Sequence, residues 1–121
     1  MTQSYTTAAL EKENRVFSGT PGVSRENRGS GFRPAFCDTE SGRVELSRFA
    51  NGLLAPVHLF DGLPESWIVA GDATAGVTAI KQSVVAGFER DGCFYTRKQA
   101  AEAVVSESRR SFAWGIEPAY V

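Results

Sequence analysis

The sequence predicts an α+β protein, with an antiparallel β-meander of about five to seven strands, one C-terminal helix packed on it and a flexible N-terminal arm. Two observations lead to this prediction. Between residues 32 and 95, short apolar runs alternate with polar residues and are separated by Gly, Asn, Asp and Pro, which is typical of strands joined by tight turns. From residue 96 the apolar spacing changes to three and four residues, which indicates a helix.

The chain of 121 residues is expected to form one domain, with residues 1–31 as the flexible arm and residues 32–121 as the α+β body. The arm holds no sustained hydrophobic period, and Gly- and Ser-containing runs interrupt it at Ser18–Gly22 and Arg28–Gly31. Three apolar residues are candidates to anchor it to a core: Val16, Phe17 and Val23.

The first strand is expected over Phe32–Cys37, where apolar residues recur with a period of two. Pro34 has no N–H to donate to a ladder, so this segment is an edge strand or Pro34 lies at its start. A turn at Asp38–Gly42 leads into Arg43–Phe49, whose alternation predicts the clearest strand and hairpin of the chain. Asn51-Gly52 predicts a further tight turn. The next strands are expected at Pro56–Phe60, Trp67–Ala70 and Val77–Ile80.

The stretch Ser83–Gly92 leaves two alternatives open. Val84, Val85 and Phe88 fit one face of a helix that begins after Ser83 and stops at Gly92. However, Gly87 weakens a helix, and Asp91-Gly92 between two apolar runs is typical of a hairpin turn. We favour the hairpin, which joins Val84–Glu89 to Cys93–Tyr95.

The last helix begins at a capping box, in which Thr96 and Gln99 satisfy each other's backbone amides. Apolar and small residues at helical spacing then predict a narrow stripe that docks on a sheet: Ala101, Val104, Val105, Ser108 and Phe112.

Composition and charge exclude several classes of function. The net charge is −1, and 42% of the residues are hydrophobic, as in ordinary globular proteins. No apolar stretch approaches the roughly 18 residues that span a bilayer, and the polar N-terminus lacks the features of a secretory signal. We therefore expect a cytoplasmic protein, monomeric or dimeric, that has no membrane partner.

No motif indicates catalysis. His58, the single histidine, is expected to be a surface or hydrogen-bonded residue in a strand. An enzyme of unfamiliar type centred on His58 is the third alternative, and it requires a carboxylate within hydrogen-bond reach of the ring. One histidine and two scattered cysteines, Cys37 and Cys93, predict no metal site, and the glycine clusters match no phosphate-binding motif. We expect no cofactor.

Two segments favour binding functions instead. Residues 15–34 carry a net charge of +3, because they contain four arginines, Arg15, Arg25, Arg28 and Arg33, and one acidic residue, Glu26. An arm with this charge can bind nucleic-acid phosphates. At the other end of the chain, aromatic residues are typical of protein interfaces: Phe112, Trp114 and Tyr120. The leading hypothesis is a non-enzymatic protein that binds a macromolecular partner, most simply another protein. Nucleic-acid binding through the arginine arm is the alternative.

Several runs of the chain resemble small hypothetical proteins encoded in accessory regions of proteobacterial genomes, near plasmid or integrated-element genes. These runs are Gly31–Val44, Ser47–Gly52, Pro56–Leu59, Asp61–Pro64 and Gly87–Arg97. The resemblance transfers no fold, activity or catalytic residue. It implies an accessory protein of mobile DNA, a class rich in small partner-binding proteins that includes inhibitors of host systems.

Overall fold

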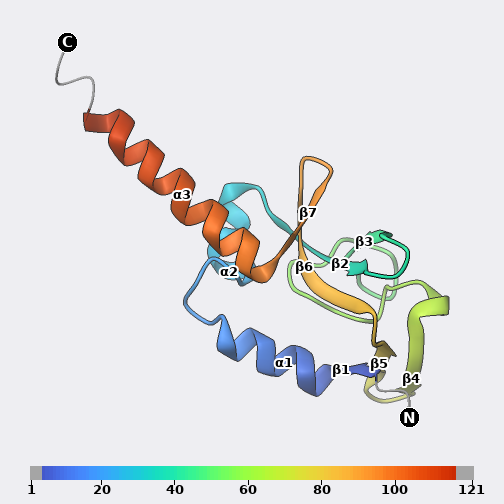
Figure 1. Ribbon diagram of the computed structural model, residues 1–121. Helices are drawn as coiled ribbons and strands as arrows, with labels where there is room; N and C mark the ends of the chain where they lie inside the picture. The colour runs from blue at the N-terminus through green and yellow to red at the C-terminus, as the bar shows by residue number, and fades with distance from the viewer. Residues whose placement is uncertain (1–3, 117–121) are drawn as a thin grey trace.

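The computed structural model describes the backbone of residues 4–116 and the side chains of residues 4–108. Within these ranges the fold is α+β, as predicted, with seven strands in two antiparallel sheets and a C-terminal helix packed on one of them (Figure 1). The elements in chain order are β1 (Ser4–Thr6), α1 (Thr7–Val16), α2 (Ser24–Asn27), the 3-10 turn η1 (Arg28–Ser30), β2 (Arg33–Asp38), β3 (Val44–Leu46), the 3-10 turn η2 (Glu65–Trp67), β4 (Ile68–Asp72), β5 (Gly76–Lys81), β6 (Val84–Arg90), β7 (Cys93–Thr96) and α3 (Arg97–Ile116).

The strand order departs from that of a single meander. One sheet has the order β3-β2-β6-β7 and the other has the order β1-β5-β4. The inner strand β2 pairs with its neighbour β3 and also with β6, which follows much later in the chain. Pro34 therefore does not mark an edge strand; it is the second residue of β2, in agreement with the alternative that it lies at a strand start.

Two clusters of buried residues form the core. The larger one draws on both sheets, on α1 and on the chain before β4: Tyr5, Leu10, Phe36, Phe60, Leu63, Trp67, Ile80, Val84 and Ala86. The smaller one lies where α3 packs on β6 and β7, and it consists of Phe32, Phe88 and Ala100 with Tyr95, Ala103 and Val104 around them. The burial of these aromatic rings is a main source of the stability of the fold.

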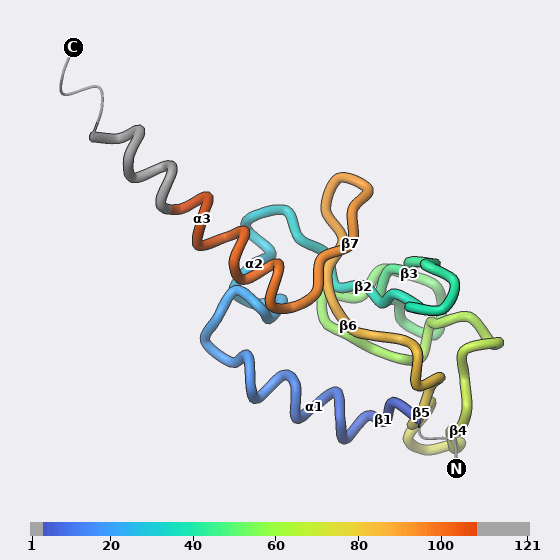
Figure 2. Tube along the Cα trace, viewed as in Figure 1, coloured from blue at the N-terminus to red at the C-terminus, as the bar shows by residue number. Residues whose placement is uncertain are grey.

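The N-terminal segment differs from the expected flexible arm, because it folds onto the body. β1 pairs with β5, and Tyr5 and Leu10 are buried in the core, whereas the expected anchor Val16 is 68% exposed. Thr6 caps α1 by accepting a hydrogen bond from the Ala9 amide at 3.1 Å. Figure 2 follows the chain from β1 through α1 to α2, which contacts α3. A strand of three residues and a helix with one buried side chain, Leu10, give no visible hydrophobic period.

The hairpin alternative for Ser83–Gly92 is confirmed. β6 and β7 pair antiparallel, and the turn residues Asp91 and Gly92 have φ values of 55° and 82°, as a type I′ turn requires. The capping box of α3 is also confirmed, since Thr96 N donates to Gln99 Oε1 at 2.9 Å and Gln99 N donates to Thr96 Oγ1 at 3.1 Å.

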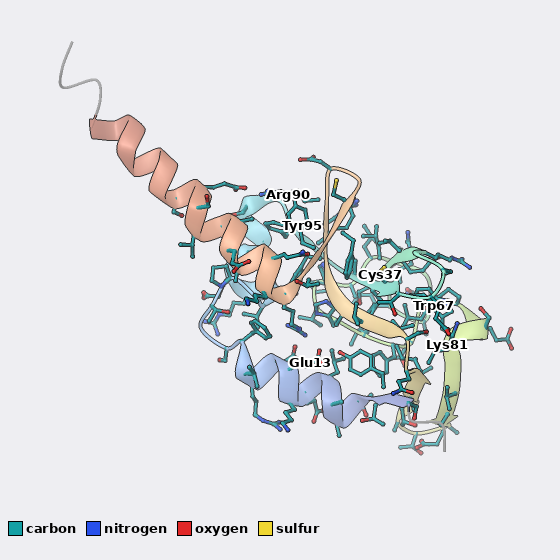
Figure 3. All side chains as sticks on the ribbon, in the orientation of Figure 1. Glu13, Cys37, Trp67, Lys81, Arg90 and Tyr95 are labelled. Carbon is teal, nitrogen blue, oxygen red and sulfur yellow. The ribbon has the colours of Figure 1, made fainter. Side chains whose placement is uncertain are left out.

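The face of α3 that packs on the sheet includes Val104 of the predicted stripe, but it also includes Ala100, which the stripe did not contain. Ala100 is fully buried and Ala103 and Val104 pack beside it, whereas Val105 is 43% exposed. Arg90 fastens this contact: its guanidinium lies 4.2 Å from the centre of the Phe32 ring and forms an ion pair of 2.7 Å with Glu107 of α3. Figure 3 shows Arg90 close to Tyr95 beside α3. None of the helices in residues 4–116 combines the length and apolar character that a membrane span requires.

Candidate functional site

The most unusual part of the described chain is the connection between β3 and η2. It runs from Ser47 to Pro64 with no helix or strand of its own, and we call it the 47–64 loop. Connections longer than about 12–15 residues without secondary structure are uncommon in compact domains and are often functional. The prediction of a strand at Pro56–Phe60 is wrong. These residues have no sheet partner; instead Ser47 Oγ donates to Val57 O and accepts from Leu59 N, both at 2.8 Å.

His58 anchors the middle of this loop in the body. The side chain is 6% exposed, and its Nε2 lies 2.6 Å from the carbonyl oxygen of Gly87 in β6. Because a carbonyl only accepts, Nε2 carries the proton and Nδ1 faces Nη2 of Arg97 at 3.4 Å. Burial, and next the positive charge of Arg97, lower the pKa of His58 from 6.5 to about 3, so the ring is neutral.

These contacts bear on the hypothesis of an enzyme centred on His58. The two partners of the ring are a backbone carbonyl and a guanidinium, and neither is the carboxylate that the hypothesis requires. A neutral ring with both nitrogens engaged positions the loop. His58 is thus hydrogen-bonded, as the sequence suggested, but it is buried and lies outside any strand.

The outer side of the loop is apolar. Among residues whose side chains are described, nine large hydrophobic side chains are exposed, and four of them come from one short stretch of chain: Phe49 (41%), Leu53 (65%), Leu54 (47%) and Val57 (47%). Phe49 N donates to Leu53 O at 2.8 Å, which holds Phe49 and Leu53 together. Single exposed apolar residues are normal on a protein surface, whereas a group of them is typical of a contact site. The remaining five are spread over α1, β3, β4, β6 and α3.

A pocket of about 270 Å³, which we call the Phe32 pocket, lies beside this apolar surface. Its lining residues come from η1, from the link between η1 and β2, from β2, from β3 and from the 47–64 loop: Arg28, Phe32, Arg33, Pro34, Leu46, Ser47, Leu54, Ala55 and Pro56. Phe32, Ala55 and Ser47 are buried, whereas Leu54 is 47% exposed and both arginines are exposed. The arrangement is an apolar hollow with positive charge beside it.

The structure brings two of the four arm arginines to one place. Arg28 and Arg33 both line the Phe32 pocket, whereas Arg15 lies in α1 and Arg25 in α2, and neither lines it. Arg33 forms an ion pair of 2.8 Å with Glu89. Side-chain spacing in sequence alone could not show this pairing, because the two residues meet through the β2–β6 ladder.

The three aromatic residues proposed as an interface are not placed by the structure. Phe112 and Trp114 belong to α3, but their side chains and the whole of Tyr120 lie outside the described residues. The apolar residues of the 47–64 loop were missed, because the stretch was interpreted as a turn and a strand. The adjacent pair Leu53-Leu54 was the available signal, since it follows a turn and breaks the alternation of a strand.

A second cavity, of about 480 Å³, is lined by residues that include Tyr5, Glu13 and Arg97. Tyr5 donates to Glu13 Oε1 at 2.6 Å, and burial together with this bond raises the pKa of Tyr5. Arg97 is 4% exposed; it donates to Gly22 O at 2.9 Å and to Asn14 Oδ1. Figure 3 shows Glu13 on α1. These groups are paired with one another, and they tie the N-terminal segment to the start of α3.

Comparison with protein-family models, with curated proteins and with solved structures finds no match for this chain. Among the described residues, no group of three or more His, Cys, Asp or Glu side chains is arranged to hold a metal ion. The candidate site is therefore defined by its own geometry: the apolar outer side of the 47–64 loop and the Phe32 pocket next to it.

Proposed function

We propose that the protein functions by binding another protein, and that the apolar outer side of the 47–64 loop is the contact surface. The exposure of Phe49, Leu53, Leu54 and Val57 on one loop is the observation that carries this proposal. Exposed apolar groups lose contact with water when a partner covers them, which favours association by roughly 25 cal/mol per Å² of apolar surface.

The loop also has the rigidity that a recognition surface needs. Hydrogen bonds of Ser47 at 2.8 Å and of His58 at 2.6 Å hold the loop, and its own residues Ala55, Phe60 and Leu63 are buried. A surface that is already ordered loses little conformational entropy on binding, so more of the contact energy appears as affinity. The apolar residues outside are not needed to fill the core, which these buried residues already do.

The resemblance to accessory proteins of mobile DNA supports a partner from the host, and a role as inhibitor or modulator stays a prediction. Nucleic-acid binding has less support. Of the four arginines, Arg28 and Arg33 alone line the Phe32 pocket, and Arg33 is paired with Glu89, whereas a dedicated nucleic-acid site gathers unpaired basic residues on one face.

A pair of matched variants tests the proposal. Phe49→Ser with Leu53→Ser removes apolar surface from the loop, and Val16→Ser with Val69→Ser removes exposed apolar surface elsewhere, at positions 68% and 58% exposed. In affinity capture from the native host lysate, we expect the loop variant to recover at least about tenfold less of one specific partner than wild type does. The control variant should recover as much of it as wild type. Equal recovery of every protein by both variants and wild type would refute the surface, provided that thermal unfolding shows all three folded.

A further inference from the structure

The Phe32 pocket is large enough for one large side chain and lies just below the usual size range of small-molecule pockets. Its volume is about 270 Å³, whereas pockets for drug-sized ligands start at about 300 Å³ and extend to about 1,000 Å³. Interface hot spots commonly consist of one large side chain in a pocket of this kind, surrounded by contacts that exclude water. The Phe32 pocket adjoins the apolar side of the 47–64 loop through Leu54, which belongs to both.

The chemistry of the floor selects an apolar occupant. Phe32, Pro34 and Ala55 are buried and carry no side-chain donor or acceptor. Ser47 is the polar residue among the buried ones, and its hydroxyl is already engaged with Val57 O and Leu59 N. A polar side chain placed here would lose its contact with water without gaining a hydrogen-bond partner, which disfavours its burial. An aromatic or large aliphatic side chain meets no such cost.

The positive charge at the pocket favours a partner in which acidic residues flank the apolar side chain. Within residues 4–108, the side chain of Arg28 is exposed and its guanidinium forms no side-chain hydrogen bond or ion pair, so its charge is not neutralised. Arg33, with half of its side chain exposed, contributes a second guanidinium, which Glu89 neutralises. The surplus positive charge therefore comes from Arg28. Charge complementarity across an interface increases the rate of association and excludes partners of the wrong sign.

We propose that the Phe32 pocket receives one large apolar side chain from an acidic segment of the partner protein, and that Arg28 recognises the carboxylates beside it. This assignment rests on the proposed function and specifies the chemistry of the partner. Nucleic acid is the other polyanion that Arg28 could meet, but the polar edges of its bases would find no free hydrogen-bond partner among the buried residues of the pocket, where the Ser47 hydroxyl is already engaged.

The test uses the full-length chain and three short fluorescein-labelled peptides of equal length. The first has a central Phe flanked by Glu residues, the second has Ala in place of the Phe, and the third has Lys in place of every Glu. We expect fluorescence polarisation to show the tightest binding for the Glu/Phe peptide, and we expect that binding to weaken with added salt. Equal binding of the three peptides, or no binding of the Glu/Phe peptide up to about millimolar concentration, would overturn the proposal.

Two charge-reversal variants identify the arginine. Arg28→Glu places an acid at the pocket, and Arg25→Glu makes the same change at an exposed position of α2 that does not line the pocket. Neither side chain has a partner among the described residues whose loss would unfold the chain. We expect Arg28→Glu to lower the affinity for the Glu/Phe peptide at least about tenfold and Arg25→Glu to lower it less than twofold. Equal weakening by both variants would indicate a diffuse electrostatic attraction and reject the pocket.

The two proposals fail in different ways. If the loop variant Phe49→Ser with Leu53→Ser loses a partner while the peptides show no preference, the contact surface stands and the assignment of the pocket falls. If the Glu/Phe peptide binds through Arg28 but no captured protein depends on the loop, the pocket stands and the loop is not the principal surface. A labelled single-stranded oligonucleotide that binds more tightly than the Glu/Phe peptide would reject the protein-segment proposal in favour of nucleic acid.

Discussion

At the scale of single residues, buried polar side chains connect segments that are far apart in the sequence. His58 and Arg97 lie 39 positions apart in the sequence and meet at 3.4 Å inside the protein. Asp38, buried at the end of β2, accepts from Ser83 at 2.7 Å and from Lys81 at 3.0 Å, and these bonds lower its pKa to about 2. Local turn chemistry predicted the turn that begins at Asp38. The partners of His58 and Arg97 could not be predicted, because no local pattern encodes a contact across that distance.

The lowered pKa of His58 predicts a pH dependence of stability. The unfolded chain takes up a proton near pH 6.5, whereas the folded chain does so only near pH 3. The unfolded state therefore binds more protons between these values, and the free energy of unfolding falls as the pH falls, by at most about 1.4 kcal/mol per pH unit. His58→Gln keeps a donor for Gly87 O but does not titrate, so its urea unfolding should change less between about pH 7 and about pH 5.

The choice of pH range separates this effect from that of the acids. Asp38 has a lowered pKa, so its contribution is present above its ordinary pKa of 3.8 and is lost only as the pH falls toward 2. The same pH dependence in wild type and His58→Gln over about pH 5–7 would mean that the ring does not stay neutral in the folded protein.

At the scale of elements, local signals predicted the β6–β7 hairpin and the start of α3. Both depend on residues close in sequence: Asp91-Gly92 in the turn, and Thr96 with Gln99 in the capping box. The 47–64 loop was mispredicted, because its anchors are hydrogen bonds to Ser47 and to Gly87 rather than a ladder with a neighbouring strand. Periodicity detects alternation of burial, and it does not reveal which group satisfies a backbone carbonyl.

Gly87 is the point at which β6, β7 and the loop meet. A Cβ added there would collide with Tyr95 O and with the Phe94 ring, and His58 bonds to the Gly87 carbonyl. We expect Gly87→Ala to lower the free energy of unfolding by about 1–3 kcal/mol in urea denaturation, as overpacking does. Gly29→Ala is the matched control, because nothing lies within 4 Å of the added Cβ. A Gly87→Ala variant as stable as the control would show that the hairpin shifts to admit the methyl group.

At the scale of the whole molecule, Arg97 joins the N-terminal segment to the sheet and to α3. Its donors reach Gly22 O and Asn14, and Nε lies 3.7 Å from Oε1 of Glu13, which also accepts from Tyr5. The segment contributes a strand to the smaller sheet and two residues to the core. Composition suggested an arm, but one buried arginine and one short strand make the segment part of the domain.

Replacing this arginine should release the segment. Arg97→Met keeps the apolar bulk but leaves Gly22 O and Asn14 without their donor, at a cost of about 1–3 kcal/mol. We expect local opening to become roughly tenfold more frequent, visible as faster chymotrypsin cleavage after Phe17. Lys98→Met, at the exposed neighbouring position, should leave the cleavage rate unchanged. Equal rates in the two variants would show that Tyr5 and Leu10 hold the segment without Arg97.

The sequence by itself determined the fold class, the β6–β7 hairpin and the capping of α3, because each depends on the period of apolar residues or on groups within four positions of one another. Only the tertiary structure decided the pairing of β2 with β6, the docking of the N-terminal segment and the outward display of Phe49 and Leu53. These features depend on contacts between distant residues, and they are stable because many such contacts form together.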